Sequence, residues 1–360
     1  ADVIATVGHH GGDDSKSPVK AIVDQVAGVK SEGDHVVVFE LKNGNADFPF
    51  MLAAPQLGIL PADGNGGVAV GDGNGTGAYK VVSYDPGVRL ELERNPNYFM
   101  PDRAWFDSAE AITIADSAAR QNALITDEVD IIDRVEVKTA EHLNRVDSVS
   151  ILDVVGTLHY TFPMRTDTAP FDNNDVRLAL KYAMDREELL QKILRGYGTL
   201  GNDHPISPVN RFHASELAQR QYDPDKAKYH AEKAGGINVQ LSAADSGFPG
   251  SVDAATLIKE HAAKAGIGIE VIREPNDGYW SDVWMKKPWC ACYWSGRPTE
   301  DWMFTDAYAE ESAWNDSFWK HDRFNALLKE ARAELDTGKR REMYVEMQRI
   351  TSDEGGVAIP

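Results

Sequence analysis

The chain has 360 residues, of which 42% are hydrophobic, so it is long enough for two or three domains with cores of their own. Its formal net charge is -20, from 57 acidic and 37 basic side chains, which favours solubility and disfavours nucleic acid or anionic lipid as a partner. No run of about 18 apolar residues occurs, so the sequence contains no candidate membrane span.

The N-terminal part of the chain predicts short elements joined by polar connections. A helix start is expected at residues 1–6, a strand at 36–41 and a helical piece at 48–54. His9 and His10 precede the acidic pair Asp13 and Asp14. Adjacent histidines at this spacing match no established pattern of metal ligands, so we expect a polar loop and no metal site.

The segment from Gly75 to Phe99 predicts a β-hairpin. Two strands flank a turn at Asp85-Pro86-Gly87, and a loop follows at Asn95-Pro96-Asn97. A Gly- and Asn-rich connection at 63–77 precedes it. The hairpin is expected to be scaffold, without ligand contacts.

Strands and helices alternate from residue 112 onward, which indicates an α/β fold. Strands are expected at 112–114, 129–132, 158–164, 237–241, 267–272 and 289–294. Helices are expected at 116–124, 174–184, 185–196, 223–235 and 253–265. Two more are expected near the end of the sequence, because apolar residues recur at helical spacing from Phe324 to Leu335 and again from Met343 to Ile350. Asp116, Asp185 and Asp223 are suited to cap three of these helices, and Glu188, three residues after Asp185, is expected to complete a capping box. The strands at 237–241 and 267–272 enclose one helix, which predicts a parallel crossover.

The two cysteines, Cys290 and Cys292, lie in one predicted strand. Residues two apart in a strand are separated by roughly 6.5–7 Å, at or beyond the reach of an unstrained disulfide. We therefore expect two packed side chains and no disulfide or metal site.

Several segments, in their order along the chain, resemble motifs of the extracytoplasmic solute-binding proteins of ABC importers, family 5, the branch that carries peptides, nickel chelates and opines. The segments are Gly75-Thr-Gly-Ala-Tyr79 with Asn95-Pro-Asn-Tyr98, Pro170-Phe-Asp-Asn-Asn-Asp-Val-Arg177 with Tyr182-Ala-Met-Asp-Arg186, Tyr222-Asp-Pro-Asp-Lys-Ala227, Leu257–Ile269 and Trp294-Ser-Gly-Arg-Pro-Thr-Glu-Asp301. Together they extend over most of the chain.

This resemblance implies a bilobed, periplasmic-binding-protein-like α/β fold (type II, Venus flytrap) with an extra lobe. Residues 1–73 would form part of the extra lobe, 74–165 an incomplete lobe I, and 166–360 the second main lobe. The resemblance also implies a fragment that lacks both ends, a signal peptide in the full-length gene, and a periplasmic or other extracytoplasmic location.

The implied function is capture of a peptide or related solute in an interlobe cleft and its delivery to the transmembrane permease subunits of the ABC transporter. We expect a monomer that is not an enzyme and has no cofactor. The sequence contains no H-E-x-x-H, G-x-S-x-G or Walker motif. Two alternatives stay open: a hydrolase acting on a peptide or sugar derivative through Glu300 and Asp301, and a signalling receptor lobe of the same fold.

The expected ligand site is the strand exit after Trp294, since open α/β sheets bind ligands at the carboxyl ends of their strands. In peptide-carrying members of the family an aspartate pairs with the ligand's ammonium group, and Arg297 occupies that place here. Arg297 would repel an ammonium and bind a carboxylate or phosphate, unless it pairs with a local acid and only shapes the loop. The candidate ligand-binding residues are Arg297, Trp294, Tyr293, Trp280, Glu300, Asp301 and His204.

Overall fold

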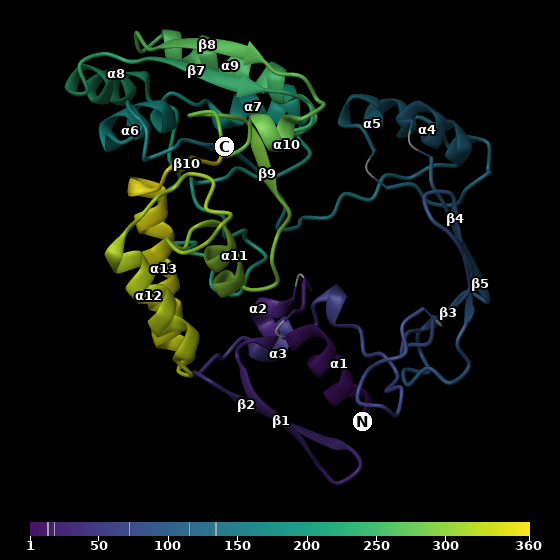
Figure 1. Ribbon diagram of the computed structural model, residues 1–360. Helices are drawn as coiled ribbons and strands as arrows, with labels where there is room; N and C mark the ends of the chain where they lie inside the picture. Colours follow the sequence, from purple (N-terminus) through teal and green to yellow (C-terminus); the bar gives the residue numbers. More distant parts are fainter. Residues whose placement is uncertain (13, 18, 72, 115, 134) are drawn as a thin grey trace. The chain divides into compact units, whose positions relative to one another are not determined.

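The chain forms two compact units, Ala1–Ile151 and Leu152–Pro360, in a computed structural model (Figure 1). The structure describes residues 1–12, 14–17, 19–71, 73–114, 116–133 and 135–360. Each unit is considered by itself. The division into lobes at residues 73 and 165 stays a prediction.

The first unit begins with a small helical core beside a two-stranded hairpin. Its elements are α1 (Asp2–Gly11), α2 (Lys20–Val23), β1 (Val26–Glu32), β2 (Val36–Leu41), α3 (Phe48–Met51) and the 3-10 turn η1 (Pro55–Leu57). Val19, Phe48 and Met51 are buried. The strand predicted at 36–41 is confirmed, whereas β1 was not predicted because its glycine and polar residues give no clear alternation. It forms by antiparallel pairing with β2.

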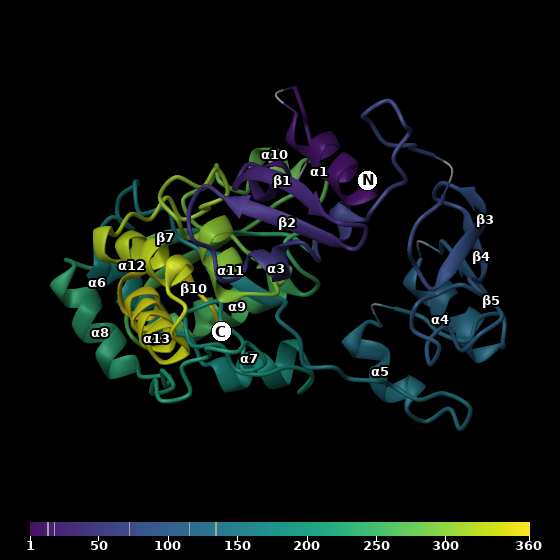
Figure 2. The ribbon, with the colours of Figure 1, turned by 90° about the horizontal axis from the view of Figure 1, so that it is seen from below.

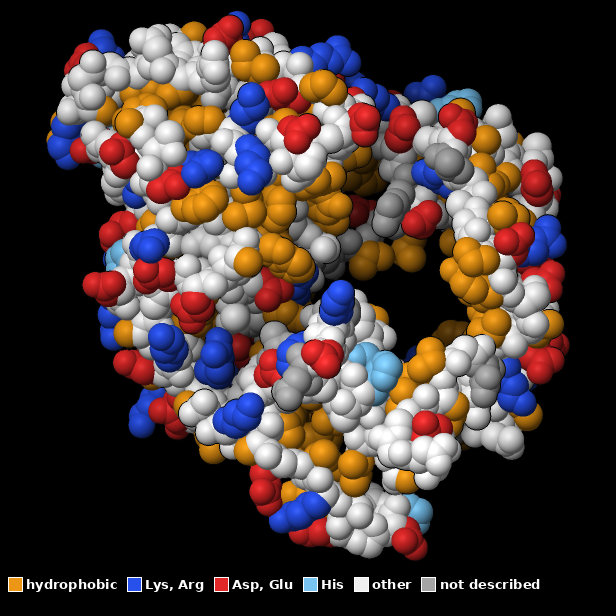
Figure 3. Space-filling view, in the orientation of Figure 1, with side chains coloured by type: hydrophobic (Ala, Val, Ile, Leu, Met, Phe, Trp, Pro, Cys, Tyr) orange, Lys and Arg blue, Asp and Glu red, His pale blue; other side chains and the backbone are white. Residues whose placement is uncertain are grey.

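The predicted β-hairpin is confirmed as β3 (Tyr79–Asp85) and β4 (Arg89–Arg94), which pair in antiparallel register. β5 (Ser108–Ile112) adds a third strand to β4, a few residues before the expected position. Val81 pairs with Leu92 and Tyr84 with Leu90, which places apolar side chains on one face of the sheet. Val81 and Tyr84 are exposed, and Figure 3 shows hydrophobic side chains gathered over these strands.

The first unit ends with α4 (Ser117–Ile125) and α5 (Val137–Leu143). Asp116 caps α4 as predicted, since its carboxylate accepts the Ala119 N–H at 2.7 Å. The strand predicted at 129–132 is wrong. The N–H groups of Glu128 and Val129 donate to the Ala123 carbonyl, so this segment closes the end of α4 instead of joining a sheet.

The second unit contains two small sheets. β6 (His159–Pro163) lies between β9 (Cys292–Trp294) and β10 (Val357–Ala358) and is antiparallel to both. β7 (Asn238–Ala243) and β8 (Gly268–Arg273) are parallel, with α9 (Ser251–Ala263) between them in the chain, which confirms the predicted parallel pairing. A parallel bridge between Ser242 and Cys290 links the two sheets.

The other helices of this unit lie between β6 and β10 in the chain. They are α6 (Asn174–Tyr182), α7 (Arg186–Ile193), α8 (Pro224–Lys233), α10 (Tyr279–Asp282), α11 (Glu300–Ala307), α12 (Asp322–Ala333) and α13 (Thr337–Glu354). α12 and α13 lie side by side in both ribbon views (Figures 1 and 2). Their apolar stripes are buried as predicted, except that Met343 is only partly buried and that Leu335 lies beyond the end of α12 and is 81% exposed.

A buried charge network joins the end of α13 to the helices next to it. Asp203 is fully buried and accepts two hydrogen bonds of 2.7 Å from Arg186, one of 2.9 Å from Arg220 and one of 2.9 Å from the Ile359 N–H. Although burial opposes ionisation, Arg186, Lys181 and Arg220 hold the pKa of Asp203 below its ordinary value.

Cationic side chains also bind the free carbonyls at the C-terminal end of α13. The Lys181 ammonium, from α6, donates to Ser352 at 2.9 Å and to Gly355 at 2.8 Å. Arg177 donates to the Glu354 carbonyl at 2.7 Å. Positive charge at the C-terminus of a helix is stabilised by the helix dipole, so these contacts fix α13 to α6.

We predict that Asp203→Ala lowers the free energy of unfolding by about 3–5 kcal/mol, because it removes the carboxylate that pairs with the buried Arg186 and leaves Arg220 only its pair with Asp353. Urea denaturation measures the change. Glu216→Ala, which breaks an exposed pair with Arg341, is the control and should leave the midpoint nearly unchanged. Equal midpoints for the two variants would contradict the prediction.

Candidate ligand-binding surface

The loop that leaves β9 is held in place by close packing. β9 pairs with β6 so that Trp294 lies opposite His159, and α11 begins after Thr299, whose hydroxyl accepts the Trp302 N–H. Gly296 approaches Thr157 so closely that a Cβ atom at this position would overlap the Thr157 side chain and backbone. Only glycine fits at this position, and the loop that carries Arg297 therefore has a defined path.

Arg297 lies in a local ion pair. Its Nε donates to Asp306 Oδ2 at 2.7 Å and its Nη1 donates to the Ser295 carbonyl at 2.9 Å. The guanidinium also lies 5.8 Å from the ring centre of Trp294. Burial raises the pKa of Asp306, and the contact with Arg297 opposes that rise. The pair with a local acid, one of the two alternatives from the sequence, is thus present, while anion binding stays a prediction.

Glu300 and Asp301 are buried in the first turn of α11 and make contacts inside the fold. Glu300 Oε1 accepts the Phe212 N–H at 2.6 Å. Asp301 accepts hydrogen bonds of 3.0 and 3.2 Å from Arg332 Nε. Both carboxylates therefore tie α11 to other segments, and their part in ligand binding or hydrolysis stays a prediction.

His204 is buried beside two further histidines. Its ring centre lies 5.8 Å from that of His213, and its Nδ1 has no hydrogen-bond partner among the described residues. Burial, with a smaller effect of His213, lowers the pKa of His204 to about 3. His159 donates from Nδ1 to the Thr157 carbonyl, and burial lowers its pKa to about 4. Both imidazoles are therefore neutral at physiological pH.

Five aromatic rings form a continuous cluster around β9, which we call the aromatic patch: Trp280, Trp284, Tyr293, Trp294 and Trp314. Adjacent ring centres lie 5.6 to 6.5 Å apart. Trp280, Tyr293 and Trp314 are 42%, 40% and 52% exposed, whereas Trp294 is buried. The structure thus brings together three rings proposed as ligand contacts from the sequence, Trp280, Tyr293 and Trp294, and adds Trp284 and Trp314.

Asp316 was also missed by the sequence analysis. Its Oδ2 accepts hydrogen bonds of 3.1 Å from both Trp284 Nε1 and Trp294 Nε1. The carboxylate is buried, and the described residues offer it no ion pair. Burial raises its pKa to about 6, against the opposing effect of the indole hydrogen bonds. An Asn-Asp-Ser segment in a loop gave no sign of this role.

The comparison with known proteins identifies the family. Residues 1–316 match the model for bacterial extracellular solute-binding proteins, family 5 (middle). The chain belongs to this family. It is 23% identical over 353 residues to the di/tripeptide-binding protein 1 of Pseudomonas aeruginosa, covering 91% of this chain and 64% of that protein. It is also 23% identical over 360 residues to the dipeptide-binding protein of Escherichia coli, covering 93% and 66%.

Solved structures of the family share the fold. The periplasmic binding protein DppA of Helicobacter pylori has a TM-score of 0.80 at 21% identity, covering 99% of this chain and 75% of that one. CtaP of Listeria monocytogenes has a TM-score of 0.84 at 19% identity, covering 99% and 76%. The α/β, periplasmic-binding-protein-like fold expected from the sequence is therefore confirmed. The chain spans 64% and 66% of the length of the two curated relatives named above.

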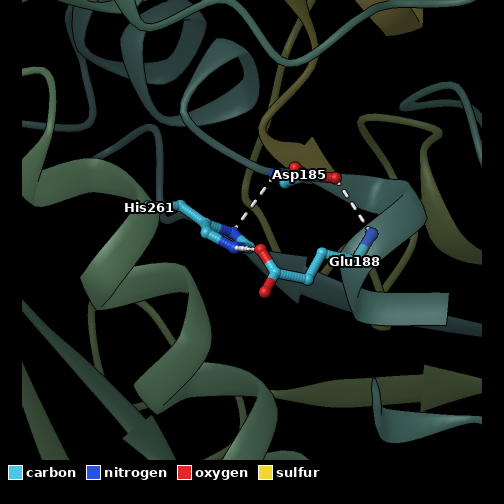
Figure 4. A group of neighbouring side chains, drawn as sticks. All are labelled: Asp185, Glu188 and His261. Atoms are coloured by element: carbon cyan, nitrogen blue, oxygen red, sulfur yellow. Dashed lines mark hydrogen bonds and ion pairs between the residues drawn. The ribbon is translucent and has the colours of Figure 1, made fainter. Parts of the chain in front are cut away.

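One group of side chains in this family 5 chain has the composition of a metal site. Figure 4 shows Asp185, Glu188 and His261, whose potential ligand atoms lie within 4.8 Å of one another. The Asp185 N–H donates to His261 Nδ1 at 3.2 Å, so the ring proton lies on Nε2, which donates to Glu188 at 2.7 Å. Both ring nitrogens are occupied, and the group acts as a cap that ties α7 to α9.

The cap explains a departure from the sequence prediction. Asp185 caps α7 by accepting the Glu188 N–H at 2.9 Å, as expected. In a complete capping box the Glu188 side chain would accept the Asp185 N–H. Here His261, from a helix far along the chain, accepts it instead, which sequence spacing alone cannot show.

The two N-terminal histidines lie in a helix. His9 and His10 belong to α1, so the loop expected there is wrong, and His10 Nδ1 lies 2.7 Å from Ser17 Oγ. Asp13 lies outside the described residues. Cys290 and Cys292 are both buried, which confirms that they are packed side chains.

In the parts of the chain that the structure describes, no helix is both long and apolar enough to cross a membrane.

We predict that His261→Leu lowers the free energy of unfolding by about 1–3 kcal/mol, because it leaves the Asp185 N–H without an acceptor. Chemical denaturation measures the loss. His142→Leu, at an exposed position, is the matched control. If added Zn²⁺ raises the melting temperature of the wild type but not of His261→Leu, the group binds metal and its description as a cap only is wrong.

We predict that Asp316→Asn stabilises the protein at about pH 7.5. The raised pKa of Asp316 means that ionisation opposes folding, so stability falls as pH rises from about 4 to about 6 and stays lower above that range. A shift of about two units corresponds to about 3 kcal/mol, the largest gain expected. Denaturation at about pH 4, where both side chains are neutral, should show little difference. A gain of equal size at both pH values would contradict the prediction.

Proposed function

We propose that the complete protein is the solute-binding subunit of an ABC importer, which captures a peptide or related small solute outside the cytoplasm and delivers it to the membrane permease. The match to the family model over residues 1–316 carries this proposal. Relatives and structural neighbours support it by their names, which include di- and tripeptide-binding proteins and complexes with a nonapeptide, with Ni(L-His) and with agropinic acid.

The proposed mechanism is closure around the solute. The solute binds one conformation of the protein more tightly than another and shifts their equilibrium, and the permease then recognises the closed form. This mechanism requires no chemical step, in line with a monomeric binding protein that is not an enzyme and has no cofactor. Neither the hydrolase nor the signalling receptor gains an observation that favours it.

On this chain, we assign solute contacts to the exposed rings of the aromatic patch and to Arg297. Trp280 and Tyr293 offer exposed ring surface, and aromatic walls of this kind suit small-molecule sites. Arg297 uses Nε and Nη1 inside the fold, and among the described residues its Nη2 donates no hydrogen bond. That group is suited to a carboxylate or phosphate of the solute while Asp306 holds the rest of the side chain in place.

A thermal-shift screen of the full-length protein against di- and tripeptides, opines and nickel chelates tests the function, because a ligand that binds only the folded state raises the melting temperature. We expect a rise with at least one of these solutes. If none of them raises the melting temperature, the proposed solute classes are wrong.

For an anionic solute found in this way, Arg297→Ala should weaken binding about 10- to 100-fold, the loss expected for a charge-assisted hydrogen bond. Titration calorimetry measures the affinity. Arg323→Ala, which removes an exposed arginine paired with Glu346, is the control and should bind as the wild type does. Unchanged affinity in Arg297→Ala would exclude the anion contact.

A further inference from the structure

The two central rings of the aromatic patch share one hydrogen-bond acceptor. Trp284 follows α10, Trp294 ends β9, and Asp316 lies in the loop before α12, so three separate elements meet at one carboxylate oxygen. The indole N–H is the only polar group of each tryptophan side chain. Fixing both N–H groups to one point therefore restricts the rotation of both rings.

The acceptor is itself held in a rigid loop. The side-chain amide of Asn315 donates to the Trp319 carbonyl at 2.7 Å, and its oxygen accepts hydrogen bonds from Ser317 Oγ at 3.1 Å and from the Trp319 N–H at 3.3 Å. Asn315, Asp316 and Ser317 are all buried. Asp316 is therefore a fixed point relative to which the indoles are oriented.

Exposed rings of the patch pack against the two indoles that are hydrogen-bonded to Asp316. Trp280 meets Trp284 edge to face at 5.9 Å and Tyr293 at 5.6 Å. Trp314 lies tilted against Trp294 at 6.2 Å. If the Trp284 and Trp294 indoles lost their orientation, the exposed rings of the patch would therefore move as well. Among the described residues, Asp316 makes hydrogen bonds with the two central indoles and with none of the exposed rings.

Burying a carboxylate such as that of Asp316 costs more free energy than burying an apolar side chain of similar size. In the surroundings of Asp316 a leucine would avoid the penalty of burying a charge without a counterion. What the carboxylate provides is one strong acceptor for two donors, since an ionised oxygen forms stronger hydrogen bonds than a neutral one. This property serves orientation more than stability.

We propose that Asp316 is a positioning residue that orients the aromatic patch, and that the exposed rings of the patch bind a planar apolar group of the solute. The second part rests on the proposed function. Rings held in place before binding lose little entropy when a ligand packs on them, so the benefit of orientation would appear in affinity.

The orientation is tested without any ligand. Near-ultraviolet circular dichroism of the full-length protein reports the fixed environment of tryptophan rings. We expect Asp316→Asn, which keeps an acceptor oxygen, to retain the tryptophan bands of the wild type. Asp316→Leu should lose about half of their intensity while the far-ultraviolet spectrum stays unchanged. If Asp316→Leu folds and keeps the tryptophan bands, Asp316 does not position the patch.

Binding is tested by calorimetry with two tripeptides, Ala-Trp-Ala and Ala-Ala-Ala. We expect the wild type and Asp316→Asn to prefer Ala-Trp-Ala by about 10-fold, and Asp316→Leu to lose most of that preference. Trp314→Ala alters an exposed ring without touching the buried carboxylate, so it should lose the preference even if Asp316→Leu fails to fold.

The outcomes separate the two claims. Equal affinity of the wild type for both tripeptides would overturn the role of the patch in binding a planar group and leave the proposed transport function intact. Binding of neither tripeptide, together with no response in the thermal-shift screen, would overturn the proposed function. In that case the dichroism spectra still decide whether Asp316 positions the rings.

Discussion

The second unit depends on the ion network around Asp203. One buried carboxylate holds Arg186 and Arg220 together and also binds the N–H of Ile359, while Lys181 and Arg177 bind the last carbonyls of α13. Helices α6 and α13 are thereby fixed to the end of β10, which pairs with the central strand β6. Because β6 also carries β9, the position of the candidate ligand-binding surface follows from this network.

Two buried carboxylates in this unit show how surroundings decide the behaviour of the same chemical group. Asp203 is surrounded by cations, which keep its pKa low in spite of burial. Asp316 receives hydrogen bonds from two indoles, with smaller contributions from the Cys292 thiol and its own backbone, and burial raises its pKa to about 6. The first arrangement stabilises the charged form and holds the fold together. The second orients side chains at the surface and opposes folding when the group is ionised.

The candidate site was only partly visible in the sequence. Trp280, Tyr293 and Trp294 were identified beside the strand exit, and the structure joins their rings in one patch. Glu300 and Asp301, close in sequence to the same loop, are buried against Phe212 and Arg332. Distance along the sequence from a strand end therefore indicated which side chains lie close together, but it could not distinguish an exposed side chain from one that α11 directs into the core.

The sequence by itself determined what depends on neighbouring residues: the hairpin at 79–94, the caps at Asp116 and Asp185, the apolar stripes of α12 and α13, and membership of family 5 through motifs in order. Only the tertiary structure decided the partners of Arg297, Asp316 and His261, the pairing of β1, and the loss of the strand expected at 129–132. The physical reason is that these outcomes depend on donors, acceptors or strands from distant parts of the chain, which packing brings together. A local sequence pattern does not specify which distant groups will meet.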